Sequence, residues 1–269
     1  MEPDIRQMTA LFPDISAQLR SAMSSLHLAA AQVAPAEVRE VDPELDQKAA
    51  LLDQSYYRLL RLANNLTVMA ELGGVEPQPE YDQDIVDVVL KTFEQGVDLA
   101  DLLGIHLSFS CAMDRHICAF RRQDVEQILL QLLSNALKFT SGGGTVTVEL
   151  KRSGRHLLLS VADTGRGIPQ EQMPGLFEAA HTPGFVVPPQ GAGLGLAIVR
   201  LLAERMGGSV AAVSREGEGS AFTVSLPDRQ CGLLRLSDVP GDYSGGFNKT
   251  LLGLADALPP KAFCIRSQD

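Results

Sequence analysis

The stretch Asp163-Thr164-Gly165-Arg166-Gly167-Ile168 decides the fold, because it joins a strand pattern to a glycine-rich turn. The apolar run at residues 157–162 predicts a strand, which ends at the carboxylate of Asp163. A carboxylate accepts a hydrogen bond from an amino group, and glycines, which have no Cβ, let a flat ring approach the backbone closely. Taken alone, the stretch is also compatible with a simple turn.

A helical pattern at residues 124–139 precedes this strand. Polar side chains recur there at steps of four, four and three, so they form one stripe opposite an apolar face. The polar positions are Gln127, Gln131, Asn135 and Lys138. Taken alone, such a stripe indicates a solvated helix face.

The run Gly191-Ala192-Gly193-Leu194-Gly195-Leu196 opens a further amphipathic helix. The unpaired N–H groups and the positive dipole end of a helix start suit a phosphate, although such a glycine run is not specific by itself. The run follows Pro188-Pro189 rather than a strand, unlike the run of a dinucleotide fold. Gly-x-x-x-x-Gly-Lys-Ser/Thr is absent, which excludes a P-loop, so a different nucleotide site remains.

Together these motifs resemble the GHKL ATPase superfamily and, within it, the sensor histidine kinases of bacterial two-component systems. The resemblance covers nearly all of residues 80–227. Four stretches resemble the N box, the first glycine box, the phenylalanine box and the second glycine box of the family. They are, in that order, Gln131 to Thr140, Asp163 to Ile168, Leu176-Phe177-Glu178 and Gly191 to Ile198.

The resemblance implies an ATP site in which Asn135 holds Mg²⁺ and Asp163 binds the adenine amino group. Lys138 and the backbone of residues 193–195 would hold phosphates, and residues 171–190 would form a mobile lid. The other implied ATP-binding residues are Gly165, Gly167, Ile168, Phe177, Gly191, Gly193, Leu194, Gly195 and Leu196. Gln131 stands at a catalytic position where most histidine kinases have Asn. Because Gln carries the same carboxamide group as Asn, ATP binding should survive this change.

The first 75 residues predict a helical hairpin. Apolar residues recur at helical spacing over residues 5–33, where Pro13 either kinks the helix or begins it. A connection at residues 35–43 leads to a second helical pattern, which Gly73-Gly74 ends. Two helices bury little core alone, so we expect homodimerisation through residues 1–75 into a four-helix bundle. The alternative is that the hairpin packs on its own C-terminal domain.

The hairpin departs from the family at the phosphoacceptor segment. Ala17 stands where the family has its histidine, and Gln18 stands where it has the acid or base. Phosphoryl acceptance needs a nucleophilic ring nitrogen and a neighbouring carboxylate, which a methyl and an amide do not supply. His27 lies ten residues further on and about 80° around the helix. We interpret it as a partly exposed structural histidine.

The remaining patterns predict an α+β fold, in which the hairpin precedes a GHKL-type sandwich with helices on one face of a mixed sheet. We expect helices near residues 84–103, 124–139 and 193–206. Strands are expected near residues 106–110, 116–120, 145–151, 156–163, 209–215 and 221–226. The domains are then the hairpin at 1–75, the ATP-binding domain at 76–227 and a C-terminal tail at 228–269 that docks on the body. Residues 73–79 predict a hinge.

Composition limits the partners and the location. With 269 residues, 45% of them hydrophobic, the chain can bury a core, and its net charge of −10 disfavours nucleic acid and anionic membranes. No apolar run is long enough to span a membrane, and the start lacks a signal-peptide pattern, so we expect a cytoplasmic protein. The four scattered cysteines do not predict a zinc site.

Two functions of different kinds remain open. The first is a histidine-kinase-like enzyme that transfers a phosphoryl group from Mg·ATP to an acceptor other than Ala17. The second is a non-catalytic, nucleotide-binding scaffold, or pseudokinase, that regulates a response regulator or another kinase. An anti-sigma serine kinase of the same superfamily is disfavoured, because that group lacks the long hairpin.

Overall fold

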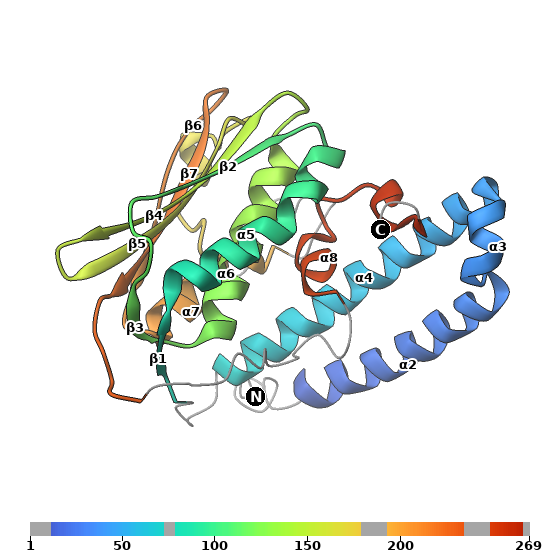
Figure 1. The fold of residues 1–269 in the computed structure, drawn as a ribbon, viewed down its shortest axis with the longest axis horizontal. Coiled ribbons are helices and arrows are strands. Elements are labelled where there is room, and N and C mark those ends of the chain that lie inside the picture. Colours follow the sequence, from blue (N-terminus) through green and yellow to red (C-terminus); the bar gives the residue numbers. More distant parts are fainter. Residues whose placement is uncertain (1–11, 73–78, 179–192, 234–247, 266–269) are drawn as a thin grey trace, which may run out of the picture. The chain divides into compact units, whose positions relative to one another are not determined.

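The computed structural model describes residues 12–72, 79–178, 193–233 and 248–265 (Figure 1). The chain divides into two compact units, which we describe separately. The helical unit comprises residues 1–75 and 255–269. The second unit, residues 76–254, contains the nucleotide site that the sequence predicts, and we call it the nucleotide-binding unit. Residues 1–11 and most of the expected hinge lie outside the described residues. The C-terminal stretch that we expected as one tail is therefore divided between the two units.

The helical unit contains the predicted hairpin, formed by α2 (Phe12–Val33) and α4 (Pro43–Leu72). The predicted connection between them contains a short helix, α3 (Ala36–Val41). None of the residues of α3 is buried, so this helix has no apolar stripe that a sequence pattern would reveal. Asp42 then caps α4, because its Oδ1 accepts hydrogen bonds of 3.0 Å from the backbone N–H groups of Glu44 and Leu45.

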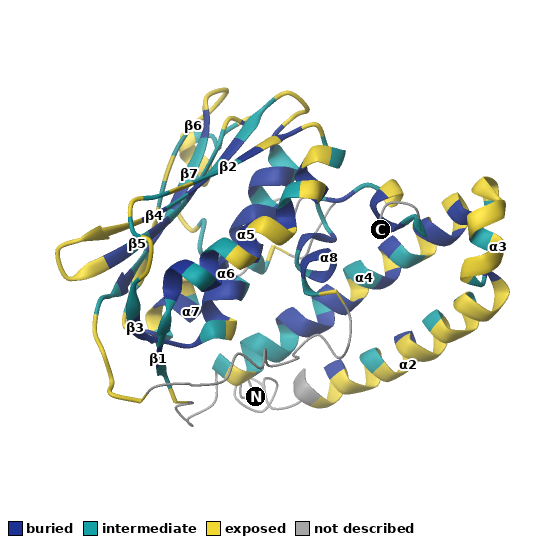
Figure 2. Ribbon diagram, in the orientation of Figure 1, coloured by how far each residue is buried: buried dark blue, intermediate teal, exposed yellow. Residues whose placement is uncertain are grey.

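Only part of the apolar surface of the hairpin is covered within the chain (Figure 2). Met23 on α2 and Tyr56, Leu60 and Ala63 on α4 are buried. Most of the exposed large apolar residues in the described part of the chain lie in the helical unit, and the exceptions are Val213 and Leu233. Those in the helical unit are Ile15, Leu19, Leu26, Leu28, Val33, Val38, Val41, Leu51, Leu52 and Leu59.

A C-terminal segment completes the helical unit. Residues 255–265, which include the 3₁₀ turn η2 (Pro260–Phe263), pack along α4. Leu258, Ala262 and Phe263 are buried, and the Phe263 ring lies 5.3 Å from the Tyr57 ring, centroid to centroid. These residues supply apolar contacts on α4 that α2 does not make.

The nucleotide-binding unit has a mixed five-stranded sheet with helices on one face, as predicted (Figure 1). The strand order is β2-β4-β5-β7-β6, in which only the β2–β4 pair is parallel. The strands are β2 (His106–Cys111), β4 (Thr145–Ser153), β5 (His156–Asp163), β6 (Ser209–Arg215) and β7 (Gly219–Pro227). The helices are α5 (Ile85–Leu102), α6 (Arg122–Phe139), α7 (Gly195–Arg205) and α8 (Lys249–Leu254), with a 3₁₀ turn η1 (Gln170–Gln172).

A separate two-stranded sheet pairs β1 (Tyr81–Asp84) with β3 (Ile117–Phe120). We did not predict β1, because the residues Tyr-Asp-Gln-Asp lack apolar alternation. Asp82 holds this strand by its side chain, which accepts hydrogen bonds from the backbone N–H groups of Cys231 (2.9 Å) and Gly232 (2.8 Å). Polar contacts distant in sequence therefore support β1.

The core of this unit lies between the sheet and α6. Alternate residues of β4 and β5 are buried, and the apolar stripe of α6 packs on the same side. The buried set includes Val146, Val148, Leu150, Leu157, Leu159, Val161, Ile128, Leu129, Leu132 and Leu133. This packing places the end of β5 beside the C-terminal end of α6. Within the described residues, we find no helix with the length and apolarity needed to cross a membrane.

Candidate nucleotide site

Asp163 is the last residue of β5, where it pairs with Val146 on one side and Ser220 on the other. Its Oδ1 accepts a hydrogen bond of 2.8 Å from the N–H of Gly165. Burial raises the pKa of the Asp163 carboxyl, and hydrogen bonds from the backbone N–H groups of Gly165 and Ser220 partly offset this rise. The carboxylate is thus half-buried and held in one orientation at the end of the sheet.

The glycines after Asp163 let the loop lie against the backbone of the same unit. A Cβ on Gly165 would come within 2.3 Å of the Phe139 carbonyl oxygen. Gly167 has φ of +67°, and a Cβ there would lie 2.0 Å from the carbonyl oxygen of Arg215. Both positions therefore exclude larger residues, because the loop passes between the end of α6 and the β6–β7 turn.

The polar stripe of α6 is only partly solvated. Asn135 and Lys138 are half-buried, whereas Gln131 is 2% exposed, so the stripe is more than a solvated helix face. Gln131 faces α7 instead: a Cβ placed on Gly195 would lie 2.9 Å from Oε1 of Gln131. The buried carboxamide therefore brings the N-box helix against the first residue of α7.

The start of α7 is open to solvent at several residues. Gly193 is exposed and has φ of +67°, while Leu194, Gly195 and Leu196 are half-buried. The N-cap residue, Leu194, makes no side-chain hydrogen bond to this helix start. Gly191 and residues 179–190 of the predicted lid lie outside the described residues.

Two cationic groups lie beside the loop that follows Asp163. The guanidinium carbon of Arg166 is 4.6 Å from the centroid of the Phe139 ring, and Nζ of Lys138 is 5.1 Å from it. Phe139 ends α6, so this aromatic ring brings the cations of the N box and of the first glycine box together. Positive charge therefore gathers near one edge of the candidate site.

Phe177 and Ile168 lie at the β6–β7 side of the unit. The Phe177 ring meets the Phe222 ring edge to face, with centroids 6.3 Å apart. The backbone N–H of Ile168 donates a hydrogen bond of 2.8 Å to Oγ of Ser214. Phe177 thus contacts β7, which pairs with β5, whereas Ile168 contacts the edge strand β6.

Two further residues, Ser214 and Gly219, contribute to the site, and we did not predict their contribution from the sequence. The hydroxyl of Ser214 also donates to the Gly219 carbonyl (2.9 Å), which connects the glycine loop to the β6–β7 turn. Gly219 has φ of +101°, and a Cβ there would lie 2.0 Å from the carbonyl oxygen of Asp163. A serine in an edge strand carries no sequence signal, whereas Gly219 lies in a stretch that matches the end of the family pattern.

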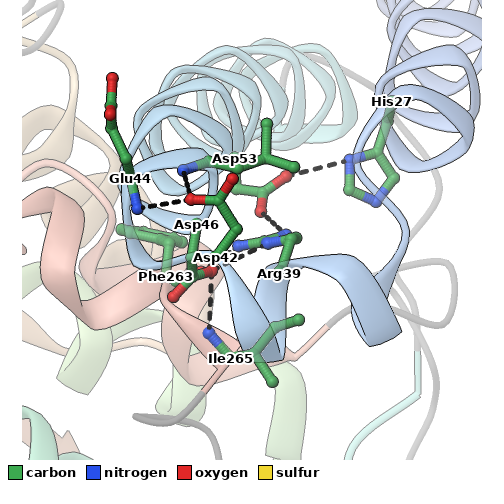
Figure 3. Close-up of polar contacts among 9 residues, drawn as sticks. His27, Arg39, Asp42, Glu44, Asp46, Asp53, Phe263 and Ile265 are labelled. Carbon is green, nitrogen blue, oxygen red and sulfur yellow. Dashed lines mark hydrogen bonds and ion pairs between the residues drawn. The ribbon is translucent and has the colours of Figure 1, made fainter.

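On the hairpin, Ala17 and Gln18 are exposed residues of α2. His27 is engaged further along α2 (Figure 3). Its ring stacks on Tyr56 with centroids 4.4 Å apart, and its Nδ1 lies 3.5 Å from Oδ1 of Asp53. These contacts join α2 to α4, in agreement with the interpretation of His27 as a structural histidine.

Comparison with known proteins agrees with this architecture. Residues 121–230 match the family of histidine kinase-, DNA gyrase B- and HSP90-like ATPases. Sensor protein DivL of Caulobacter vibrioides is 35% identical over 175 residues, which cover 64% of this chain and 22% of DivL. Sensor protein SrrB of Staphylococcus aureus is 30% identical over 235 residues, which cover 84% of this chain and 39% of SrrB.

The structure is also similar to that of full-length ShkA in complex with AMPPNP, with a TM-score of 0.67 and 27% identity. The match covers 82% of this chain and 46% of ShkA. This chain thus spans between about a fifth and about two fifths of the length of the sensor proteins that it matches.

The sheet, its covering helices and the motifs between them define an ATPase domain of the GHKL superfamily. The chain is thus similar to proteins of the sensor histidine kinase type.

Proposed function

We propose that this protein binds Mg·ATP at the candidate nucleotide site and acts as a histidine-kinase-like phosphotransferase in two-component signal transduction. The observation that carries the proposal is the carboxylate of Asp163, which the N–H of Gly165 holds at 2.8 Å at the end of β5. A fixed, half-buried acceptor suits the amino group of adenine. ShkA, a structural relative, was solved with AMPPNP, which supports a nucleotide at the same place.

The side chains around Asp163 fit the rest of the nucleotide. Lys138 is a half-buried cation on α6, and the backbone N–H groups at the start of α7 suit phosphate oxygens. The Asn135 carboxamide offers the kind of oxygen ligand that Mg²⁺ prefers, and a bound Mg²⁺ would neutralise phosphate charge. Gln131 is buried against Gly195, so its proposed role is to position the start of α7.

The acceptor of the phosphoryl group is proposed to be a residue other than Ala17, on this protein or on a partner. A methyl group has no lone pair to attack phosphorus, and the Gln18 amide does not take a proton. A response regulator or another kinase is the proposed partner. The exposed apolar residues of the hairpin support homodimerisation through residues 1–75. The net charge of −10 disfavours nucleic acid and anionic membranes as partners.

A non-catalytic scaffold is the second candidate function, and Ala17 and Gln18 favour it. In that case nucleotide binding would set the conformation of the protein that a partner recognises, without phosphoryl transfer.

Labelled ATP separates the two functions. We expect the natural protein, incubated with Mg²⁺ and γ-labelled ATP, to release labelled phosphate or to become labelled itself. The Ala17→His/Gln18→Glu variant should in addition gain acid-labile label, because it restores a ring nitrogen and a carboxylate. Asp163→Asn is the control for reactions that need the site. ATP binding without release or label would contradict the enzyme and support the scaffold.

Replacing Asp163 by asparagine should weaken ATP binding about tenfold, or about 1.4 kcal/mol, because the amide presents a donor where adenine needs an acceptor. Inosine triphosphate carries a carbonyl in place of the amino group, so the variant should lose much less affinity for it. Calorimetry with both nucleotides measures this change in preference. Asp101→Asn, at an exposed carboxylate near the end of α5, is the matched control. Unchanged affinity for ATP would refute the proposed adenine contact.

A further inference from the structure

Three polar side chains form a row across the sheet of the nucleotide-binding unit, at the end where β5 stops. The strands β5, β7 and β6 are neighbours in that order (Figure 1). Asp163 on β5 pairs with Ser220 on β7, and Ser220 pairs with Ser214 on β6. Residues directly opposite each other in a sheet point to the same face, with Cβ atoms about 5 Å apart. The hydroxyl groups of both serines therefore lie on the same face as the Asp163 carboxylate.

The hydroxyl of Ser214 has three hydrogen-bond partners. Its Oγ accepts a bond of 2.8 Å from the backbone N–H of Ile168 and donates one of 2.9 Å to the carbonyl oxygen of Gly219. Oγ of Ser220 lies 2.9 Å away as the third partner. A hydroxyl group has one proton and two acceptor lone pairs, so these three contacts use its full capacity.

These contacts determine which of the two serines is the donor. A carbonyl oxygen only accepts, so the bond to Gly219 takes the single proton of Ser214. Ser220 must then donate to Ser214, because Ser214 has no second proton to give. Ser214 and Asp163 stand on opposite sides of β7, on β6 and β5. The proton of the Ser220 hydroxyl is therefore directed away from Asp163.

The Asp163 carboxylate consequently keeps acceptor capacity for a ligand. Among the residues that the structure describes, the hydrogen bonds to this carboxylate come from the backbone N–H groups of Gly165 and Ser220. An ionised carboxylate has about four lone-pair sites, so it can accept further bonds. A hydroxyl proton from Ser220 would occupy part of this capacity and would compete with a ligand.

Ser214 also fixes the loop that follows Asp163. The loop is held to the β6–β7 side of the unit at two points, through the bond from Ile168 to Ser214 and through a bond of 2.8 Å from the N–H of Gly217 to the carbonyl oxygen of Arg166. Without the Ser214 hydroxyl, the first of these two bonds has no acceptor.

We propose that Ser214 is a positioning residue of the nucleotide site, which takes the proton of the Ser220 hydroxyl and so keeps the Asp163 carboxylate free for the amino group of adenine. Ser214 acts through Ser220 and Ile168 rather than by contact with the nucleotide. The inference rests on the proposed adenine contact of Asp163, and it adds the arrangement of protons that this contact needs.

Calorimetry with two nucleotides tests the inference. We expect Ser214→Ala to weaken ATP binding about tenfold, because the freed Ser220 proton can turn to Asp163. Inosine triphosphate lacks the amino group, so its affinity should fall by less than about threefold. Ser160→Ala is the matched control, since Ser160 forms a similar contact of 2.8 Å with Thr223 between β5 and β7, on the opposite face of the sheet. It should leave both affinities unchanged. Equal losses for both nucleotides in Ser214→Ala would overturn the inference.

A second substitution tests the route through Ser220. The variant Ser214→Ala/Ser220→Ala lacks the freed hydroxyl, so its ATP affinity should recover to within about threefold of that of the natural protein. No recovery would overturn the proposed role of the proton. If Ser214→Ala does not fold, Ser214→Cys replaces it in both measurements, because a thiol is a weaker donor and acceptor than a hydroxyl.

The same titrations separate this inference from the proposed function. A natural protein that binds no ATP would overturn both. Binding of ATP by the natural protein, with the same affinity in Ser214→Ala, would overturn the inference alone and leave the proposed function standing.

Discussion

Replacing Gly219 by alanine should lower the free energy of unfolding of the nucleotide-binding unit by about 3 kcal/mol. Two effects combine at this position. The φ of +101° is unfavourable for any residue with a Cβ, and that Cβ would lie 2.0 Å from the Asp163 carbonyl oxygen. Because this backbone cannot move without moving Asp163, we expect ATP affinity to fall at least tenfold in the same variant.

Gly217→Ala is the matched control for this prediction. Gly217 lies in the same turn with φ of +80°, but a Cβ there meets nothing within 4 Å. Gly217→Ala should therefore lower the free energy of unfolding by only about 1 kcal/mol, because only the positive φ is unfavourable for alanine. ATP affinity should be unchanged. Denaturant unfolding and calorimetry on both variants give the comparison. Equal losses of stability would mean that the close approach to Asp163 is unimportant.

The regular elements of the nucleotide-binding unit were predictable because their apolar periodicity is strong. From residue 84 to residue 227, the predicted helices and strands agree with the structure, mostly within two residues at each end. The short elements α3 and β1 were not predicted, since α3 buries no residue and β1 is held by polar contacts to residues 231 and 232. Local periodicity does not report contacts of that kind.

The candidate site was predictable where a residue belongs to a sequence motif. Asp163 and its glycines were found in this way. The burial of Gln131 and the role of Ser214 depend on which helix or strand packs opposite, so they became visible only in three dimensions. The same is true of the packing of residues 255–265 on α4, whose contacts join residues about 200 positions apart.

An ion pair between the buried Asp124 on α6 and the half-buried Arg205 on α7 also became visible only in the structure. Asp124, in the first turn of α6, is 3% exposed. Arg205, in the last turn of α7, reaches it with two hydrogen bonds: Nε to Oδ2 at 3.1 Å and Nη2 to Oδ1 at 2.5 Å. This paired geometry is the strongest that arginine and a carboxylate form. The pair ties the helix of the N box to the helix that follows the second glycine box.

Replacing Arg205 by alanine should lower the free energy of unfolding by about 3 kcal/mol, because the Asp124 carboxylate would stay buried without its closest cation. Arg200→Ala is the matched control on the same helix. Arg200 forms an exposed ion pair of 2.8 Å with Glu204, so its loss should leave stability unchanged within error. Both are measured by denaturant unfolding.

The effect of Arg205→Ala should depend on pH. Burial raises the pKa of the Asp124 carboxyl, while Arg205 and Arg121 oppose this rise. Removing Arg205 therefore raises the pKa of the folded state further above the unfolded value of about 3.9. A raised pKa favours the folded state most at low pH, and this advantage is lost as pH rises through the folded pKa. The deficit of the variant should thus be smaller at pH 5 than at pH 8, and a constant deficit would show that the lost contact is not electrostatic.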